Sequence, residues 1–157
     1  MASTKLEVRI RRARPDEADT LTALIVRAKS YWGYDQSFIE ACRPLLTLTS
    51  ESIERDPVYC AEVGETVVGV NHLKWLNEQE VCLEDLFVEP AFIGQGIGRL
   101  LWHHAVGLAR TMGAGSLVLE ADPHARPFYE HMGAVVEGHT VSTKIPGRSI
   151  PHMRYEL

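Results

Sequence analysis

The chain has 157 residues, 45% of them hydrophobic and 24% charged, and its formal net charge is −5. This length predicts one domain over residues 1–157, which buries about 70% of its unfolded surface without disulfides or a metal. The acidic balance argues against a nucleic-acid partner, which needs a basic surface, and mildly favours a cationic substrate. No run approaches the ~20 apolar residues of a membrane span, and the first five residues lack a signal peptide's apolar core. We therefore expect a cytoplasmic protein with no membrane partner.

The cysteines and histidines form no pattern typical of a disulfide or a metal site. Cys42, Cys60 and Cys82 are odd in number, widely spaced and set among apolar residues, which favours buried free thiols. A nucleophilic cysteine is the alternative, although none stands beside a histidine in a loop. The seven histidines form no H-E-x-x-H or C-x-x-C arrangement, so no metal is expected.

The first part of the chain predicts a strand followed by helices. Apolar and charged residues alternate over 6–11, which is typical of a half-exposed strand. Pro15 and the acidic residues after it predict the start of a helix. The buried stripe of this helix is expected to consist of Leu21, Leu24, Ile25 and Ala28. A shorter helix is predicted over 37–43, ended by Pro44, and one residue of the Thr49-Ser50 pair is expected to cap a further turn.

Three strands are predicted in the middle of the chain. β-forming runs over 58–63 and 66–73 flank Gly64-Glu65, which predicts a hairpin. A polar turn at 77–79 then leads to an apolar, β-rich run over 81–88. An antiparallel meander is therefore expected.

A glycine-rich turn follows the strand over 81–88. Pro90 ends the strand, and apolar residues recur with helical spacing over 97–112, where Gly113 ends the helix. The three glycines within 94–98 let the backbone approach a ligand closely. Their amides, at the positive end of the helix dipole, predict a phosphate or pyrophosphate site made of backbone. The alternative is a turn that only packs the helix on the strand.

Three phosphate-binding patterns compete for this turn. A dinucleotide fingerprint needs glycine where Arg99 stands, and a P-loop needs a lysine that follows none of these glycines. The third pattern is Q/R-x-x-G-x-G/A, which residues 93–98 match except that Ile93 replaces glutamine or arginine.

The last part of the chain predicts a strand over 116–120, a helix around 126–132, and two strands near 134–139 and 152–156. A loop over 145–151 is expected between the two final strands. The whole order of elements predicts an α/β fold with a mixed, mostly antiparallel central sheet and helices on both faces.

A second motif over 122–134 reads D-P-H-A-R-P-F-Y-E-H-M-G-A. It resembles the second signature of the Gcn5-related N-acetyltransferases, N-x-x-A-x-x-F-Y-E-x-x-G-F/A, with Asp122 in place of asparagine. The turn over 93–98 resembles the first signature of that family, and both motifs lie on the expected strand and helix frames. The sequence therefore resembles a small, bacterial-type member of the Gcn5-related N-acetyltransferase (GNAT) superfamily over essentially the whole chain.

The resemblance implies acetyl-coenzyme A as cosubstrate. In this family the central strand and the strand after it splay apart, and the cleft between them takes the pantetheine arm. Backbone groups near Phe87 and Val88 are implied to pair with that arm. The implied contacts also include Ile93, Gly94, Gln95, Gly96, Ile97, Gly98 and Arg99 at the pyrophosphate, with Asp122 and Phe128.

Three residues are predicted to carry the chemistry. Tyr129 occupies the family's tyrosine position, which implies a general acid for the coenzyme sulfur, or else an aromatic packed under the cofactor with its hydroxyl on backbone. Glu84 and Asp85 are adjacent on a strand and point to opposite faces unless a bulge intervenes. The stretch 83–88 resembles that strand in polyamine acetyltransferases, so we expect Glu84 as the base and Asp85 as its helper. The alternative is a solvent-facing acid beside a structural salt bridge.

Substrate contacts are expected from two segments. Tyr31, Trp32 and Tyr34 lie between two helices that border the acceptor site in the family, and they form either a cation–π site for an amine or a hydrophobic hinge. Arg148, in the loop over 145–151, is either a partner for a substrate carboxylate or an exposed arginine without a ligand.

The predicted function is acetyl transfer from acetyl-coenzyme A to the primary amine of a small molecule, by direct attack in a ternary complex. The alternatives are a protein-lysine or N-terminal acetyltransferase, and a coenzyme A-binding sensor module without turnover. Dimers are common in the family, so the resemblance is compatible with a homodimer. The sequence does not identify the acceptor amine.

Overall fold

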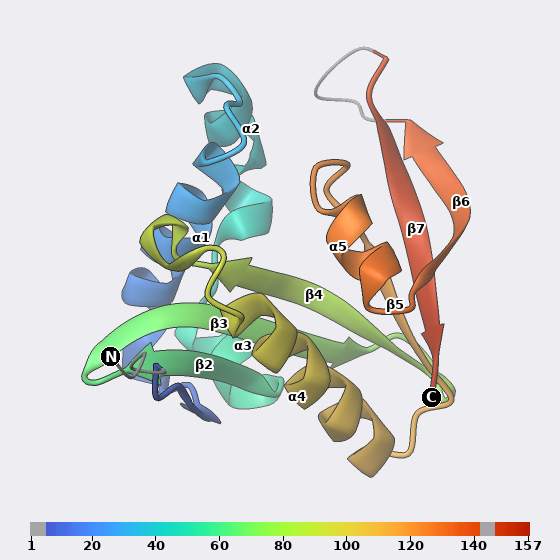
Figure 1. The fold of residues 1–157 in the computed structure, drawn as a ribbon, viewed down its shortest axis with the longest axis horizontal. Coiled ribbons are helices and arrows are strands. Elements are labelled where there is room, and N and C mark those ends of the chain that lie inside the picture. Colours follow the sequence, from blue (N-terminus) through green and yellow to red (C-terminus); the bar gives the residue numbers. More distant parts are fainter. Residues whose placement is uncertain (1–5, 142–146) are drawn as a thin grey trace, which may run out of the picture.

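A seven-stranded sheet with the order β1-β2-β3-β4-β5-β7-β6 forms the centre of the molecule (Figure 1). The computed structural model describes residues 6–141 and 147–157. Of the strand pairs formed by these residues, β4 with β5 is parallel and the others are antiparallel. The strands are β1 Arg9–Arg12, β2 Val58–Val63, β3 Thr66–Trp75, β4 Glu80–Val88, β5 Ser116–Glu120, β6 Val135–Val141 and β7 Ser149–Glu156.

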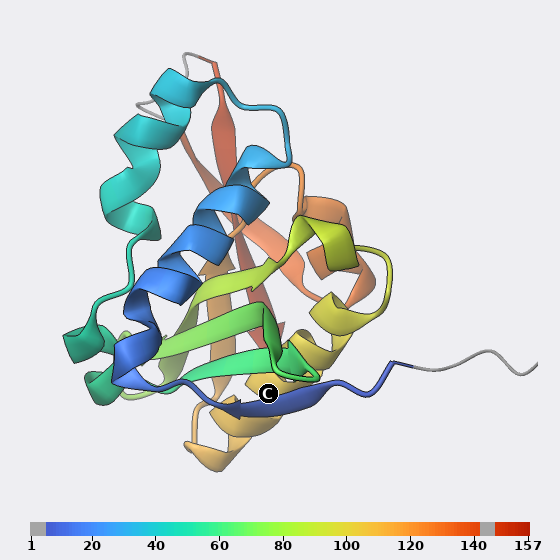
Figure 2. The ribbon, with the colours of Figure 1, turned by 90° about the vertical axis from the view of Figure 1, so that its left-hand side faces the viewer.

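Helices cover both faces of this sheet (Figures 1 and 2). They are α1 Ala18–Ser30, α2 Gln36–Leu46, α3 Ser50–Arg55, α4 Ile97–Thr111 and α5 Arg126–His131, with short 3-10 helices η1 Pro15–Glu17 and η2 Pro90–Phe92. One core cluster joins α1, α2 and α3 to β2 and β3, and another joins α4 and α5 to β3, β4, β5 and β7. The predicted mixed, mostly antiparallel sheet with helices on both faces is confirmed.

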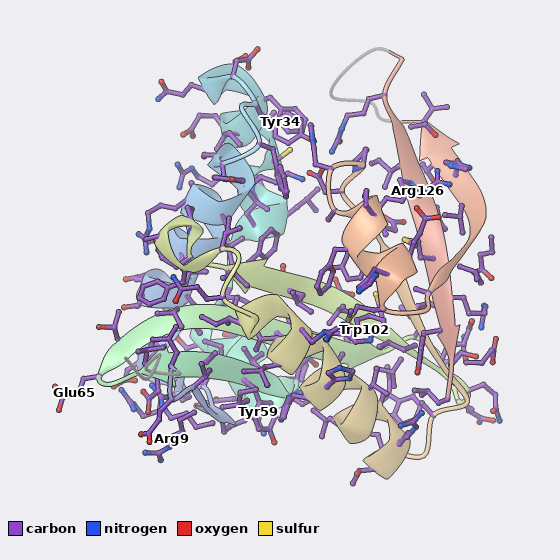
Figure 3. All side chains as sticks on the ribbon, in the orientation of Figure 1. Arg9, Tyr34, Tyr59, Glu65, Trp102 and Arg126 are labelled. Carbon is purple, nitrogen blue, oxygen red and sulfur yellow. The ribbon has the colours of Figure 1, made fainter. Side chains whose placement is uncertain are left out.

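The predicted apolar stripe of α1 is buried, because Leu21, Leu24, Ile25 and Ala28 all face the first core cluster or its edge. On the other face, Trp102 of α4 is fully buried, and Figure 3 shows it where α4 meets the β4 and β5 layer. Its ring packs edge-on against Tyr129 of α5 with ring centroids 5.7 Å apart. The core therefore fixes α5 against α4.

Strands β4 and β5 pair only at their beginnings. Hydrogen-bonded register joins residues 80–82 to residues 116–118, and the two strands then diverge. From Leu83 to Val88, β4 has β3 as a partner on one side only, so its other edge is free. This divergence opens a cleft in the middle of the sheet, as the family resemblance implied.

A β-bulge interrupts β4 beside this cleft. His72 of β3 is opposite Asp85, whereas Leu73 is opposite Leu83, so Glu84 has no partner residue in β3. A bulge breaks the strict alternation of side chains between the two faces of a sheet. Glu84 and Asp85 can therefore serve one cavity although they are adjacent in sequence.

Pro44 does not end its helix as predicted, because α2 continues to Leu46. A proline removes one amide from the helix, here the one that the Glu40 carbonyl would accept from. The loss falls in the last turn, where burial of Leu46 and a hydrogen bond from Thr47 Oγ1 to the Arg43 carbonyl hold the backbone. The predicted cap at Thr49 is confirmed by its hydrogen bond from the Ser52 amide.

Several strand boundaries also differ from the prediction. β1 occupies residues 9–12 instead of 6–11, and its pairing with β2 begins with Arg9 opposite Glu62. β7 begins at Ser149 and pairs with β6 there, so the loop predicted over 145–151 is wrong for its last three residues. Ile145 and Pro146, which the same prediction included, lie outside the described residues.

Candidate active site

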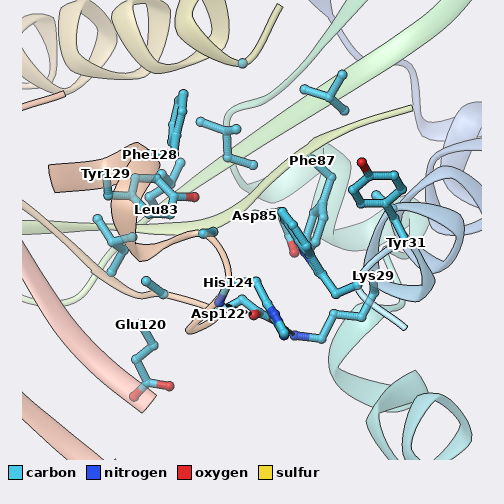
Figure 4. Close-up of a pocket in the computed structure, with 18 of the residues that line it drawn as sticks. Lys29, Tyr31, Leu83, Asp85, Phe87, Glu120, Asp122, His124, Phe128 and Tyr129 are labelled. Carbon is cyan, nitrogen blue, oxygen red and sulfur yellow. Dashed lines mark hydrogen bonds and ion pairs between the residues drawn. The ribbon is translucent and has the colours of Figure 1, made fainter. Parts of the chain in front are cut away.

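A cavity of 1060 Å³ lies where β4 and β5 diverge. Its walls come from the second half of β4, the glycine turn, the end of β5, and helices α1, α2 and α5. Figure 4 shows Tyr129 of α5 at one side of this pocket and Lys29 of α1 at the other. Tyr129, Glu84 and Asp85, the three residues predicted to carry the chemistry, all line it.

The glycine turn presents unbonded amides to the cavity. Gly94 and Gly96 have φ angles of 86° and 84°, which only glycine adopts without strain. α4 begins immediately afterwards, so the positive end of its dipole faces the turn. The amides over 94–99 donate to no acceptor among the described residues. This is the arrangement that binds phosphate groups at helix N-termini.

Ile93 corrects one detail of the predicted pyrophosphate site. Its amide donates to the Pro90 carbonyl at 3.3 Å, so the row of free amides begins at Gly94. Ile93, Gly94 and Arg99 are among the residues that line the cavity, whereas Gln95 is not. The side chain at position 93 is therefore not needed for the amides to face the cavity.

The first turn of α4 is surrounded by Phe87, Val88 and Phe128. Phe87 and Val88 line the cavity from the free edge of β4. A Cβ atom on Gly98 would contact the Phe128 ring at 3.5 Å and Val88 Cγ2 at 3.8 Å. These are ordinary van der Waals distances, so the packing of Phe128 and Val88 around the first turn of α4 would also accept a methyl group at position 98.

Tyr129 is a buried phenol whose hydroxyl has no hydrogen-bond partner among the described residues. Burial raises the pKa of this phenol well above its usual range, and the charges of Asp85 and Asp122 add to the effect. The hydroxyl therefore carries its proton at neutral pH. The alternative of a hydroxyl held by backbone finds no support among the described contacts.

Glu84 and Asp85 have different surroundings. Glu84 is exposed and forms no salt bridge with a described residue. Asp85 is largely buried, and its Oδ2 lies 3.1 Å from Nδ1 of His72. The bulge therefore gives the cavity one exposed carboxylate and one carboxylate held by a histidine.

His72 links Asp85 to a second buried acid, Asp56. His72 Nε2 lies 2.9 Å from Asp56 Oδ2, so both ring nitrogens face carboxylate oxygens. Burial opposes charging, but the hydrogen bonds to Asp85 and Asp56 raise the pKa of His72 above its ordinary value. When protonated, His72 has a hydrogen-bond donor on each ring nitrogen and can donate to both acids.

A second ionic cluster closes the other end of the cavity. Lys29 Nζ lies 2.5 Å from Asp122 Oδ2, and Arg148 Nη2 lies 3.3 Å from the same oxygen. The Tyr34 hydroxyl lies 3.0 Å from both Asp122 oxygens and accepts from Arg148 Nη2 at 2.9 Å. The Asp122 carboxylate is thus occupied by protein groups, and its predicted contact with the cofactor remains a prediction.

The other predicted substrate residues lie next to this cluster. Tyr31 and Trp32 line the cavity with partly exposed rings, and Trp32 stacks on His124 with centroids 5.2 Å apart. Arg148 also lines it, whereas Tyr34 does not and instead braces the cluster. The structure therefore brings Tyr31, Trp32 and Arg148 to one end of the cavity.

Lys29, His72 and Asp56 were not predicted from the sequence. Their roles depend on partners that lie far away in the chain: Asp122 for Lys29, and Asp85 for His72. One signal was present, because His72 occupies the same sheet face as the buried Val70 two residues earlier. A histidine at an apolar position of a strand indicates a buried polar contact, although not which one.

The sequence comparison agrees with this arrangement. The model of the acetyltransferase (GNAT) family matches residues 22–134, from the first turns of α1 through the glycine turn to the end of the second motif. The chain belongs to the GNAT family of acetyltransferases. The resemblance seen in the two signatures is confirmed.

Two relatives of this GNAT chain are named for small molecules. Streptothricin acetyltransferase from Streptomyces lavendulae is 45% identical over 51 residues, which are 32% of this chain and 26% of that protein. Thialysine N-epsilon-acetyltransferase from Caenorhabditis elegans is 28% identical over 126 residues, which are 74% of this chain and 76% of that protein. The chain thus spans about a quarter of the first relative and three quarters of the second.

Solved structures share the fold of the GNAT chain. The PaiA N-acetyltransferase from Thermoplasma acidophilum, in complex with coenzyme A, has a TM-score of 0.81 at 20% identity, covering 97% of this chain and 100% of that one. YncA from Salmonella typhimurium, with acetyl-CoA, has a TM-score of 0.69 at 19% identity, covering 96% and 94%. At these identities the likeness shows the fold.

Within residues 6–141 and 147–157, no three or more His, Cys, Asp or Glu side chains gather as a metal ion would require. No helix in the same ranges has both the length and the apolar character needed to cross a membrane.

Proposed function

We propose that this GNAT protein transfers the acetyl group of acetyl-coenzyme A to the primary amine of a small molecule, with residues 1–157 acting as one catalytic domain. The observation that carries the proposal is one cavity holding free amides, a protonated phenol and a carboxylate pair. The free amides can bind the diphosphate of the cosubstrate, the phenol can act as a general acid, and the carboxylates can act as a general base.

Two parts of the cavity wall, the glycine turn and the free edge of β4, support the proposed binding of the cosubstrate. The amides over 94–99 would hold the pyrophosphate, with Arg99 beside them. The free edge of β4 at Phe87 and Val88 offers backbone groups to an extended arm. Coenzyme A and acetyl-CoA named in the structures with the same fold support this choice of cosubstrate.

The reaction follows from the surroundings of each group. The Asp85 carboxylate, held by His72, attracts the substrate ammonium, and Glu84 accepts its proton through water. The free amine attacks the thioester carbon, whose oxygen is polarised by a backbone amide near Val88. The new C–N bond forms as the C–S bond breaks, and Tyr129 gives its proton to the departing sulfur. The attacking nitrogen then loses its second proton, which returns to the Tyr129 oxygen. Coenzyme A and a neutral acetamide are the products, and the one proton released overall is the one that Glu84 accepted.

Two of the three thiols, Cys60 and Cys82, do not line the cavity and give no support to a covalent acetyl-enzyme, whereas Cys42 does line it. Burial raises the pKa of Cys60 to about 11 and of Cys82 to about 12, and in both cases nearby acids contribute. A thiol needs its thiolate form to act as a nucleophile. The two cysteines are therefore inert at neutral pH.

A small acceptor is supported by the names of the two relatives, which are streptothricin and thialysine acetyltransferases. It is also compatible with the ionic cluster of Lys29, Asp122 and Arg148, which occupies one end of the cavity.

The test is free-thiol release from acetyl-coenzyme A in the presence of single amines. We expect release that depends on the amine and equals the amount of acetylated amine. Tight coenzyme A binding without release by any amine of a broad panel would overturn the proposal in favour of a sensor module. Faster release with lysine peptides or protein N-termini than with every small amine would contradict the small-molecule acceptor.

A further inference from the structure

The cluster at the end of the cavity contains an uncompensated positive charge. Lys29 and Arg148 share one carboxylate, Asp122, and all three side chains are between 11% and 13% exposed. Tyr34 does not balance the charge, because burial and the nearby Asp122 raise the pKa of its phenol to about 12. Two cations, one anion and a neutral phenol leave one positive charge.

This charge has no other counter-ion in the described part of the chain. Asp122 is the acid within salt-bridge distance of Lys29 and Arg148 there. Residues 1–5 and 142–146 contain no aspartate or glutamate, so they hold no carboxylate that could complete the cluster. Buried charges are costly unless paired, which makes a ligand anion the expected complement.

Donors of the cluster remain available to such an anion. Arg148 uses Nη2 for Tyr34 and Asp122, and its Nε and Nη1 have no acceptor among the described residues. Among the described residues, the side-chain polar atom that is fully buried without a hydrogen-bond partner is Asn71 Oδ1. Nε and Nη1 of Arg148 are not in this class. Both Lys29 and Arg148 line the cavity (Figure 4 shows Lys29).

The arginine is also held in place. Its guanidinium carbon lies 5.1 Å from the centre of the Tyr34 ring and 5.2 Å from that of Phe38. Stacking on aromatic rings fixes the plane of the guanidinium and so its remaining N–H donors. A guanidinium with a fixed orientation recognises a planar carboxylate better than a mobile guanidinium does.

We propose that the acceptor is an amino-carboxylate: its amine lies at Glu84 and Asp85, and its carboxylate binds Arg148 and Lys29 at the opposite charge pole of the same cavity. This inference rests on the proposed acetyl transfer. One residual positive charge matches one carboxylate, whereas a phosphate monoester carries close to two negative charges. The acidic and basic poles together select a molecule with both charges.

The first experiment compares matched amines that differ by the carboxylate alone: lysine with cadaverine, phenylalanine with phenethylamine, and tryptophan with tryptamine. Thiol release from acetyl-coenzyme A gives kcat/KM for each. In at least one pair we expect the amino acid to be favoured by about 10- to 100-fold, the usual effect of a charge-assisted hydrogen bond. Equal or better turnover of the amine lacking the carboxylate, in every pair that is acetylated, overturns the inference and leaves acetyl transfer intact.

The variants Arg148→Gln and Lys29→Met locate the effect. Each leaves one cation opposite Asp122, so the net charge of the cluster becomes zero and no charge is left unpaired. Each should lower the ratio of kcat/KM for the amino acid to kcat/KM for its matched amine toward one. Arg126→Gln is the matched control, because Arg126 is partly exposed on α5 (Figure 3) and pairs with Glu130. A preference that survives both cluster variants contradicts the proposal.

A binding measurement separates this inference from the proposed function. Protein saturated with coenzyme A is titrated with 3-phenylpropionate and with 3-phenylpropionamide, and chemical shifts or heats are followed. Neither probe has an amine, so turnover is not required. We expect saturable binding of the carboxylate that weakens about tenfold or more in Arg148→Gln. Equal affinity for acid and amide overturns the inference, and absence of thiol release with any amine overturns the proposed function.

Discussion

Glu84 and Asp85 show how neighbouring acids acquire different chemistry. Asp85 lies in hydrogen-bond contact with the buried imidazole of His72, which fixes the orientation of its carboxylate. Glu84 is exposed at the bulge and has no such partner among the described residues. Glu84 is the better proton acceptor, because water reaches it and can carry the proton away after each turnover. Asp85, which is held in place, is the better partner for the substrate ammonium.

Replacing Tyr129 by phenylalanine tests the acid. We expect kcat for thiol release to fall by roughly 10²–10⁴, because the departing thiolate loses its proton donor. Coenzyme A affinity should be unchanged, since the ring still packs on Trp102. Steady-state kinetics and a coenzyme A titration of the same sample measure both. Unchanged turnover would remove Tyr129 from the mechanism.

The two acids should separate in kinetics. Glu84→Gln is expected to lower kcat by roughly 10²–10⁴ with little effect on the KM of the amine. Asp85→Asn is expected to raise that KM by about tenfold or more, because an ion pair with the ammonium is lost. Glu120→Gln is the control, since Glu120 also lines the cavity but is exposed beside His152. The reverse pattern would exchange the roles of Glu84 and Asp85.

At the scale of elements, the glycine turn is the part that substitution tests most cleanly. A Cβ atom at Gly96 would contact nothing within 4 Å, so any cost of Gly96→Ala comes from its φ of 84°. We expect about 1–2 kcal/mol of backbone strain and a coenzyme A affinity reduced by about tenfold, since the amides must turn away. Isothermal titration and urea unfolding measure these effects.

Gly107→Ala is the matched control for that variant. Gly107 lies inside α4, has open space around its Cα, and does not have a positive φ. Alanine there should raise the free energy of unfolding by about 0.5–1 kcal/mol without changing coenzyme A affinity. Equal coenzyme A affinities for the wild type, Gly96→Ala and Gly107→Ala would show that the glycine turn does not bind the pyrophosphate.

Local patterns made β4, the glycine turn and α4 predictable. The φ preference of glycine, the stop at Gly113 and the apolar spacing of α4 all lie within one stretch of sequence. The bulge at Glu84 was not predictable, because it depends on the register of β4 against β3. The cluster around Asp122 depends on contacts with α1 and with Arg148, the residue before β7, which no local pattern encodes.

At the scale of the whole molecule, Asp56, His72 and Asp85 connect the end of α3 to two central strands. The raised pKa of His72 means that its contribution to stability is complete below its ordinary value of 6.5 and is lost as pH rises through the raised value. The pKa of Asp56 is lowered, against the effect of burial, by Arg55 and His72. Its contribution is present above 3.8 and is lost as pH falls through the lowered value.

Urea unfolding at several pH values tests this connection. We expect His72→Gln to cost about 3 kcal/mol near pH 6, because two buried carboxylates lose a cation. The difference between wild type and variant should shrink as pH rises from 6.5 through the raised pKa of folded His72, because the unfolded chain loses this proton first and the folded chain loses it at higher pH. A difference that stays constant up to pH 9 would show that His72 is neutral in the folded protein.

The central claim is direct acetyl transfer between two substrates bound in one cavity. The most direct test is the initial rate of coenzyme A thiol release over a grid of acetyl-coenzyme A and amine concentrations. A ternary complex predicts no release without amine and double-reciprocal lines that intersect. Parallel lines, or a burst of thiol before any amine is added, would contradict it, because both require an acetyl-enzyme.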